Sequence, residues 1–391
     1  MFVKRELIKS VRMLATRLFK AHRKAGAGRR STSDCVTEFH PTIDGTLLVV
    51  RCGDHSLSRI ITSQRYVRSF ACSHQWLKEC EASSSNPEIV LGVDGVDFNW
   101  KSSAIPQSLR LPEIEPQPLA TTPPMSPVDV RLIPALAATG VAVDHESLRY
   151  AIANVQLDGT RGTVTGTDGK RLVRYDGFTF PWTDRAILLP ANDVFGSPIL
   201  REVKALACGV IDNQLVIEAA AAEAGTQAEA WTLRMPITTE GRYPNVEAII
   251  GNLSNATNRV YFDKQDLAFI VKHLKQLPGD DREHSPVTLD LNGHVDLTAA
   301  GDERSKAMRV RLSRTLQVGK ATTTSMNRHY LSHAARLGIT DLWGFGDQKP
   351  VVCRGKHLVY LWQPLAGVQS PPEAPETLQI NTTDYQVSQA S

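Results

Sequence analysis

The sequence predicts an α+β protein built from three similar domains, and two observations lead to this prediction. The first is size: 391 residues are more than one hydrophobic core ordinarily serves, which indicates two or three domains. The second is a pattern that occurs three times, in which an amphipathic helix, a strand pair with a glycine turn, a second helix and further strands follow one another. The turn glycines Gly45, Gly159 and Gly293 recur at intervals of about 115 and about 135 residues, a domain-sized period.

In the first repeat, residues 4–14 carry apolar side chains at helical spacing, and a hairpin with its turn at Asp44-Gly45 follows. The other elements expected here are a helix over residues 65–81 and strands at 89–91 and 96–100. A proline-rich stretch, 112–127, then separates the first two repeats. Proline removes backbone donors and favours extended chain, so we expect a linker.

The second and third repeats continue the pattern. In the second we expect a helix near 130–139, a turn at Asp158-Gly159, a helix over 190–206 and strands at 214–218 and 231–235. In the third we expect a helix over 264–276 capped by Asp263, a hairpin over 287–298, a helix over 327–337 and strands at 351–352 and 358–362. We place the domains at 1–115, 129–252 and 257–366, with a linker at 116–128 and a disordered tail at 367–391.

Composition is that of a soluble globular protein, with 42% hydrophobic and 22% charged residues. The net charge of +3 says little about partners, but the first thirty residues hold ten Lys and Arg against the single acid Glu6. Such a block of one sign attracts phosphate. Arginine-rich, amphipathic starts also occur in mitochondrial transit peptides, but Glu6 interrupts this one.

Cysteines and histidines give no sign of chemistry. The six cysteines, Cys35, Cys52, Cys72, Cys80, Cys208 and Cys353, form no CxxC pair, so we expect neither a disulfide framework nor a zinc site, and a cytoplasmic location fits best. The sequence contains no run of about 18 apolar residues, so we expect no membrane partner. Motifs for nucleophilic, metal or nucleotide chemistry are absent, and histidines such as His40 and His55 fall singly. We therefore expect no catalytic residue, metal or cofactor.

Three sequence segments carry a family resemblance. Residues 167–172 (TDGKRL) and 241–244 (GRYP) resemble two segments of the middle domain of the bacterial DNA polymerase III beta subunit, the DNA sliding clamp. Residues 360–365 (YLWQPL) resemble that family's C-terminal strand, and Asn327 and Tyr330 match the opening of its last helix. The resemblance spans about residues 1–366, and by it the chain resembles a divergent member of this family.

Members of this family form a head-to-tail ring of two three-domain chains, in which sheets make a continuous outer wall and helices line the hole. Closing the sheets across domain and subunit boundaries leaves no free strand edges. The resemblance implies the DNA-clamp fold and a non-catalytic processivity factor that encircles duplex DNA without sequence specificity. It also implies four partners: double-stranded DNA, a second copy of the chain, a clamp loader and the catalytic subunit of DNA polymerase III.

Two sets of site residues follow from the resemblance. Basic residues on the inward helices would attract the DNA backbone, and the candidates are Lys4, Lys9, Arg12, Arg65, Arg68, Arg149, Lys272 and Lys275. A pocket between the middle and last domains would take a short peptide motif of polymerase and other partners. The residues carried over to its wall are Ile152, Thr167, Gly169, Lys170, Arg171, Leu172, Pro244, Ile249, Asn327, Tyr330, Gln363 and Pro364.

The chain also departs from the family. Gln363 stands where the family usually has a methionine, Glu247 and Ala248 stand where basic residues are common, and the chain continues past Leu365, where many members end. An alternative therefore stays open: a clamp-fold paralogue that acts as a regulatory or peptide-binding protein without a replicative role. The two differ in whether the inward helices present a continuous positive surface in a closed dimer.

Overall fold

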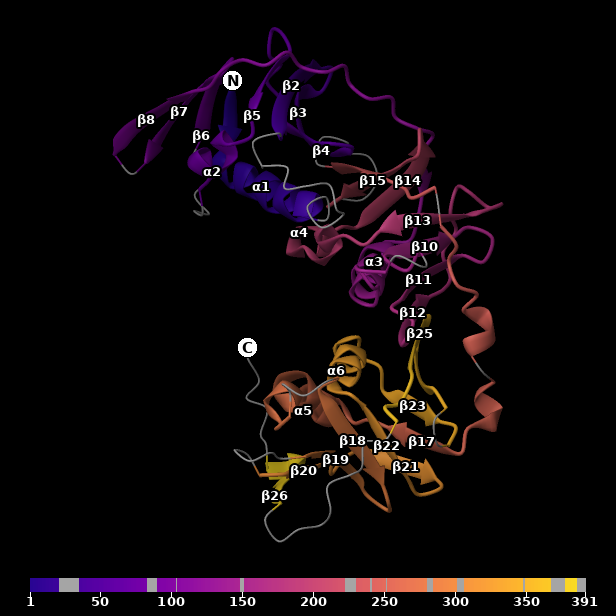
Figure 1. Cartoon of the computed structure of the whole chain (residues 1–391). Helices are drawn as coiled ribbons and strands as arrows, with labels where there is room; N and C mark the ends of the chain where they lie inside the picture. The colour runs from indigo at the N-terminus through magenta and orange to yellow at the C-terminus, as the bar shows by residue number, and fades with distance from the viewer. Residues whose placement is uncertain are drawn as a thin grey trace. The chain divides into compact units, whose positions relative to one another are not determined.

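The computed structural model describes residues 1–20, 35–82, 90–102, 104–147, 151–221, 230–239, 241–250, 252–279, 284–300, 306–346, 349–366 and 377–384. They form two compact units (Figure 1). Unit 1 comprises Met1–Gly166 and Asp176–Tyr243, and unit 2 comprises Thr167–Tyr175 and Pro244–Ser391. The sequence-based boundaries of the three domains remain a prediction.

The order of elements repeats three times: one strand, a helix, four strands, a second helix and three strands. The first repeat consists of β1 (Phe2–Lys4), α1 (Arg5–Lys20), β2 (Val36–Thr42), β3 (Gly45–Cys52), β4 (His55–Thr62), β5 (Phe70–Ser73), α2 (Trp76–Cys80), β6 (Val90–Asp94), β7 (Asp97–Ser102) and β8 (Ile105–Arg110). The second consists of β9 (Ser126–Pro127), α3 (Leu132–Val141), β10 (Asn154–Asp158), β11 (Thr163–Thr167), β12 (Arg171–Tyr175), β13 (Ala186–Pro190), η3 (Asp193–Gly196), α4 (Pro198–Arg201), β14 (Ala205–Ile211), β15 (Gln214–Ala220) and β16 (Trp231–Pro236).

The third repeat has one additional short strand, β21. Its elements are β17 (Asn258–Tyr261), α5 (Lys264–His273), η7 (Leu274–Gln276), β18 (Pro286–Leu291), β19 (Val295–Ala299), β20 (Met308–Arg311), β21 (Leu316–Gly319), β22 (Thr322–Asn327), α6 (Arg328–Arg336), β23 (Asp341–Gly344), β24 (Val351–Gly355) and β25 (Leu358–Trp362). The single-turn helices η5 (Glu247–Ile249) and η6 (Leu253–Asn255) precede it, and β26 (Leu378–Asn381) and η8 (Thr382–Asp384) follow it. The predicted α+β class with three repeats is confirmed.

In unit 1 one sheet runs through the first two repeats. Its strand order is β5-β2-β3-β4-β16-β15-β14-β9, and the two repeats meet where β4 pairs antiparallel with β16, with Leu57 opposite Leu233. A second sheet has the order β1-β6-β7-β8, and β10 pairs with β11 and β13. Helix α1 packs on β4 and α2 and buries Ile8, Leu14 and Leu18 completely.

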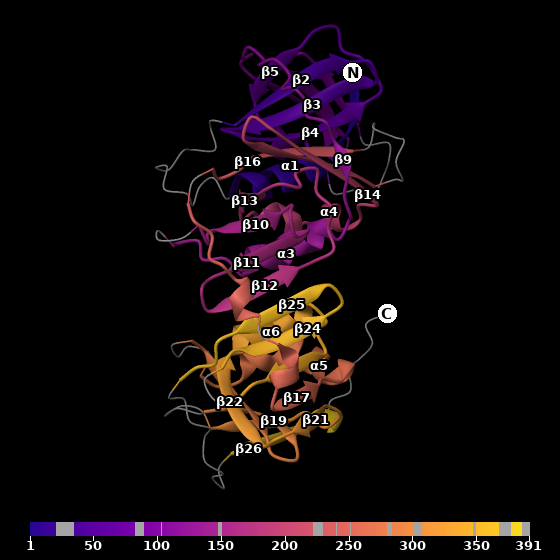
Figure 2. The same ribbon diagram turned by 90° about the vertical axis from the view of Figure 1, so that its right-hand side faces the viewer.

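In unit 2 the strands β12-β25-β24-β23-β17-β21 are neighbours in this order. A five-stranded sheet has the order β22-β18-β19-β20-β26, with β26 at its outer edge (Figures 1 and 2). Helices α5 and α6 lie side by side and contact each other. The cap predicted for α5 is confirmed, since the carboxylate of Asp263 accepts from Gln265 N at 2.8 Å.

Two helix predictions were wrong. Residues 65–81 form the strand β5 and only the short helix α2, because Phe70 stacks on Phe39 of β2 with ring centroids 4.4 Å apart, which fixes this segment as a strand. Residues 190–206 form η3, α4 and the start of β14 instead of one helix. Pro198 explains the break, because proline lacks a backbone donor and keeps the preceding residue, Ser197, extended.

Two further expectations need correction. Cys35 and Cys52 form a disulfide, since the register of β2 and β3, with Val36 opposite Arg51, makes them the next facing pair. The other four cysteines are buried and free. The tail is ordered at residues 378–384, where β26 pairs with β20 and η8 follows, so the prediction of disorder is wrong for this segment.

One buried cation anchors the N-terminus of α6. Arg328 is 0% exposed, and its guanidinium donates to the carbonyl oxygens of Leu277 at 2.6 Å, Pro278 at 2.6 Å and Pro286 at 2.9 Å. Leu277 and Pro278 directly follow η7, and Pro286 is the first residue of β18. The charged donors of Arg328 hold α6 to both segments, because a buried carbonyl without a donor is costly.

Replacing Arg328 should therefore destabilise unit 2. We expect Arg328→Met to lower the free energy of unfolding by about 3 kcal/mol, because several buried carbonyls lose their donors. Urea titration followed by far-ultraviolet circular dichroism measures it. The control is Arg336→Met at the exposed end of the same helix, expected to cost no more than about 0.5 kcal/mol. Equal effects of the two substitutions would contradict this role of Arg328.

Candidate functional site

The turn that carries the TDGKR segment is rigidly built from its own side chains. The carboxylate of Asp168 accepts from the backbone N of Lys170 at 2.9 Å and of Arg171 at 2.8 Å. Thr167 Oγ1 donates to the carbonyl of Arg171 at 2.6 Å and accepts from Gly169 N at 3.1 Å. Gly169 has φ +83°, which favours glycine, and the space where a Cβ would lie is open. The turn is thus fixed before any partner arrives.

Arg171 lies in a cage at the end of this turn. Its Nε donates to Asp168 Oδ2 at 2.9 Å, and its guanidinium lies 4.9 Å from the ring centroid of Tyr330 in α6. Its side chain is only 13% exposed, so both contacts are shielded from solvent. The arrangement joins β12 to α6.

Strand β25, the last strand of the third repeat, pairs with the strand that follows this turn. β12 and β25 pair antiparallel, with Arg171 opposite Trp362 and Leu172 opposite Leu361. Beyond the last strand pair, Gln363 N donates to the carbonyl of Lys170 at 2.8 Å. The structure therefore brings the TDGKRL and YLWQPL segments together, which the sequence resemblance requires of a peptide site.

A third segment is tied to the same strand from outside. Arg174 Nη1 donates to both carboxylate oxygens of Glu247 at 2.8 and 2.9 Å, which holds η5 against β12. Ile249 ends η5 and is 46% exposed. Arg174 and Leu172 share one face of β12, since side chains alternate along a strand. The ion pair thus joins β12 to the short helix that ends in the exposed Ile249.

Exposure sorts the predicted pocket residues into three groups. Gly169, Lys170, Ile249 and Gln363 are exposed; Arg171, Pro244, Asn327, Tyr330 and Pro364 are half-buried; Ile152, Thr167 and Leu172 are buried. Asn327 has a structural role as well, because its side chain caps α6 by accepting from His329 N at 2.9 Å. Eleven of these twelve residues belong to unit 2, and Ile152 belongs to unit 1. Whether they bind a peptide stays a prediction.

His333 lies on α6, one helical turn after Tyr330. It is 7% exposed on α6, with its ring edge-on to Tyr360 at a centroid distance of 5.4 Å. Burial, together with the charges of Arg171 and Arg336, lowers the pKa of His333 to about 4. The neutral imidazole is therefore the form that fits the folded site at neutral pH.

The predicted DNA-binding residues are spread over different environments. Arg12 is neutralised by Glu81, with Arg12 Nη2 2.8 Å from Glu81 Oε1, and Arg68 is neutralised by Glu113 at 2.9 Å. Arg65 is exposed but lies in the connection between β4 and β5, not on a helix as expected. The other described candidates are Lys4 at the end of β1, Lys9 on α1, Lys272 on α5 and Lys275 on η7, and Arg149 lies outside the described residues.

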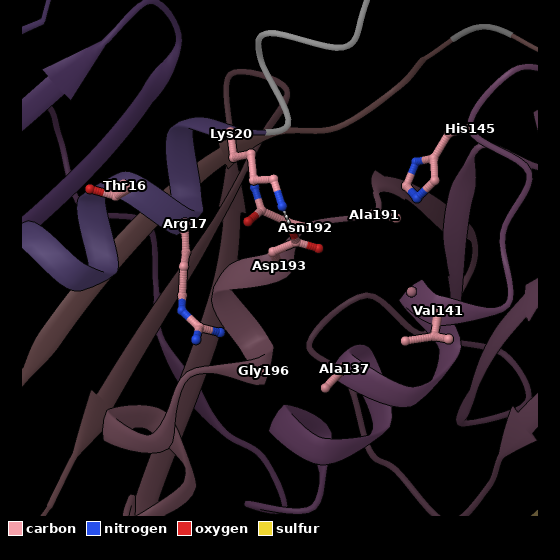
Figure 3. Close-up of a pocket in the computed structure, with 11 residues that line it drawn as sticks. Thr16, Arg17, Lys20, Ala137, Val141, His145, Ala191, Asn192, Asp193 and Gly196 are labelled. Atoms are coloured by element: carbon pink, nitrogen blue, oxygen red, sulfur yellow. Dashed lines mark hydrogen bonds and ion pairs between the residues drawn. The ribbon is translucent and has the colours of Figure 1, made fainter. Parts of the chain in front are cut away.

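A hollow of about 610 Å³ in unit 1 adds two basic residues that we did not predict (Figure 3). Arg17 and Lys20 reach into it from the last turns of α1, opposite α3 and residues 191–196. Lys20 Nζ pairs with Asp193 Oδ2 at 2.8 Å, whereas no carboxylate in the described part of the chain pairs with Arg17. The sequence did indicate that the first helix extends this far, since Leu18 continues the apolar helical spacing beyond Leu14.

The threefold repeat with its paired sheets defines the DNA sliding-clamp fold. Among solved structures, the DNA polymerase sliding clamp of Bacillus subtilis superposes with a TM-score of 0.70 at 13% identity, covering 94% of this chain and 99% of that chain. The Helicobacter pylori beta clamp bound to a DNA ligase peptide gives 0.68 at 17% identity, covering 94% and 99%. The Pseudomonas aeruginosa sliding clamp, DNA polymerase III subunit beta, bound to griselimycin gives 0.70 at 15% identity, covering 93% and 98%.

These superpositions establish the fold, and the fold expected from the sequence resemblance is confirmed. No protein family model matches the sequence, and no curated protein matches it in a sequence search. No helix among the described residues is long and apolar enough to span a membrane. Within the same residues, no group of three His, Cys, Asp or Glu side chains is arranged to hold a metal ion.

The environment of His333 predicts a pH dependence of stability. The unfolded chain binds the proton with a pKa of about 6.5 and the folded chain with a pKa of about 4, so the unfolded state takes up more protons between these values. Stability should fall by roughly 2–3 kcal/mol as the pH drops from 6.5 to 4, at about 1.4 kcal/mol for each unit. Urea unfolding across this range measures it. His333→Leu should flatten the curve, and parallel curves for the two proteins would disprove the assignment.

Proposed function

We propose that this chain is a DNA sliding clamp: a non-catalytic processivity factor that encircles duplex DNA as a homodimeric ring and tethers a replicative polymerase. The observation that carries the proposal is the threefold repeat in the sliding-clamp fold, matched over 93–94% of the chain. In this role a clamp loader opens and closes the ring, and the catalytic subunit of DNA polymerase III is the principal partner. The proposed site of action is the cytoplasm.

Sliding requires attraction to phosphate without contacts to base edges, because base contacts would hold the ring at particular sequences. Lys9 and Arg17 on α1 and Lys272 and Lys275 around the end of α5 fit this requirement as basic groups on helices. We prefer these four residues to Arg12 and Arg68 as phosphate contacts, because Glu81 neutralises Arg12 and Glu113 neutralises Arg68. The expected affinity is modest and falls steeply with salt.

The peptide site centres on the TDGKR turn. Its rigid backbone, the caged Arg171 and the exposed Ile249 supply the combination of apolar anchor and fixed polar group that recognises a short linear peptide. The Helicobacter pylori clamp was solved with a DNA ligase peptide, which supports peptide binding by this fold. Gln363 replaces an apolar wall with an amide, so we expect a motif with a polar group at that position.

A clamp-fold paralogue without a replicative role is the second candidate. Helix α3 favours it, because its sequence, LIPALAATGV, contains no charged residue. In a replicative clamp we expect most of the helices to carry basic residues that attract phosphate. In unit 1 the helix that carries most of the basic residues is α1. Retention on DNA separates the two candidates.

A topological link to DNA is the first prediction from the proposed function. The chain should stay on a closed circular plasmid through gel filtration at about 0.5 M salt, where backbone attraction alone is screened. Cutting the plasmid once should release it, because a ring slides off an open end. Equal retention on circular and linear DNA, or none on either at low salt, would contradict a sliding ring.

Peptide binding is the second prediction. Arg171→Ala together with Leu172→Ala should weaken binding of a peptide from the polymerase's C-terminus by at least about a hundredfold, since an anchor wall and its polar group are both lost. Fluorescence anisotropy with the labelled peptide measures the affinity. Arg161→Ala, which removes an ion pair between the exposed Arg161 and Asp158 in unit 1, is the control. Unchanged affinity in the double variant would move the site elsewhere.

A further inference from the structure

The repeats are joined by one rule of strand pairing. Counting along each repeat, the fourth strand pairs antiparallel with the last strand of the next repeat. Thus β4 of the first repeat pairs with β16, the last strand of the second. In the same way β12, the fourth strand of the second repeat, pairs with β25, the last strand of the third.

Applied to the third repeat, the rule reserves the edge of β20 for the last strand of a first repeat. That strand is β8, and in a head-to-tail assembly it belongs to a second copy of the chain. β8 is itself the outermost strand of its sheet, and Ile105 at its start is 64% exposed. The repeated plan therefore matches the edge of β8 to the edge of β20, because free strand edges promote association between chains.

The edge of β20 is nevertheless occupied. β26 lies along all four residues of β20, from Met308 opposite Leu378 to Arg311 opposite Asn381. This pairing is parallel, whereas both junctions between repeats are antiparallel. β26 also follows the end of the third repeat, so it is an addition to the repeated plan and not a part of it.

A buried polar contact holds β26 in place. Thr382, directly after the strand, is 2% exposed, and its Oγ1 donates to Asp266 Oδ1 at 2.6 Å and accepts from Ser313 N at 3.0 Å. Arg314 Nη1 donates to the carbonyl of Thr382 at 3.1 Å. Asp266 is 0% exposed, so the hydroxyl of the tail completes the hydrogen bonding of a carboxylate inside the fold.

Apolar contact on β26 is weaker than this polar contact. Leu378 is 49% and Ile380 36% exposed, and Ile380 borders a hollow of about 370 Å³ beside Phe269 and Leu277. A strand held by backbone pairing and by the hydrogen bonds of Thr382, with its apolar side chains half covered, can leave without exposing an apolar core. Because β26 is covalently attached to the chain, its effective concentration at the edge of β20 is near the millimolar range. The β8 strand of a second copy must compete with that concentration to bind the same edge.

We propose, on the basis of the sliding-clamp function above, that β26 is an intramolecular cap that competes with β8 of a second copy for the edge of β20. With the cap docked the chain stays open as a single copy. Release of β26 exposes β20, and antiparallel pairing with β8 then closes the ring at both subunit boundaries. The C-terminal segment thereby sets the concentration at which the ring forms.

The test is sedimentation equilibrium of the full-length chain from 0.1 to 50 µM, a range that brackets affinities near the micromolar level. Gln379→Pro, which disrupts β26, and Thr382→Val, which removes the hydroxyl, should each lower the dimer Kd by at least about tenfold, the effect of one lost charged hydrogen bond. Thr383→Val, an exposed neighbour, should leave it unchanged. Arg309→Cys with Gln379→Cys, at facing positions, should lock the chain as a monomer until reductant is added.

Ile105→Asp in β8, combined with Gln379→Pro, should abolish the increase in dimer affinity that Gln379→Pro causes. If the dimer Kd rises in Gln379→Pro, β26 belongs to the dimer interface. If the Kd is unchanged, β26 does not compete with β8. Either result would contradict the proposal that β26 is an intramolecular cap. The DNA assay separates the two proposals. Released variants that dimerise but leave circular DNA would refute the clamp function alone, whereas retention on circles with equal Kd in all variants would refute the cap alone.

Discussion

Backbone pairing between the fourth strand of one repeat and the last strand of the next is the interaction on which the rest of the structure depends. It makes one sheet of the first two repeats through β4 and β16, and it brings β25 against β12 in unit 2. Pairing of main-chain groups demands geometry more than particular side chains. This explains how the sliding-clamp fold persists at 12–17% identity.

The candidate peptide site is a product of the same pairing. The TDGKR turn ends β11 and begins β12, and β25 carries the YLWQPL segment alongside it, so the strand register places Arg171 opposite Trp362. Helix α6 then supplies Tyr330, whose ring lies against the guanidinium group of Arg171, and His333, whose pKa the charge of Arg171 lowers. Residues that stand nearly two hundred positions apart in the sequence are fixed near one another by five backbone pairs.

Much of this was predictable from the sequence, and the failures have physical causes. Apolar spacing of 3.6 residues located α1, α5 and α6, and glycine turns located the hairpins. The same spacing misplaced a helix on Phe70, whose packing on Phe39 depends on a strand thirty residues earlier. The neutralisation of Arg12 by Glu81 and of Arg68 by Glu113 also arises from long-range contacts that spacing does not report. β26 was read as disorder from its polar composition, because a strand that forms on an available edge needs little apolar surface of its own.

The central claim is that two copies of this chain close around duplex DNA, and the most direct measurement is electron cryomicroscopy of the Gln379→Pro variant assembled on a short duplex with blocked ends. The account predicts a head-to-tail ring of two copies in which β8 of each pairs antiparallel with β20 of the other, with the duplex passing through the centre. A single copy on the outside of the DNA, or a dimer joined through other strands, would contradict it.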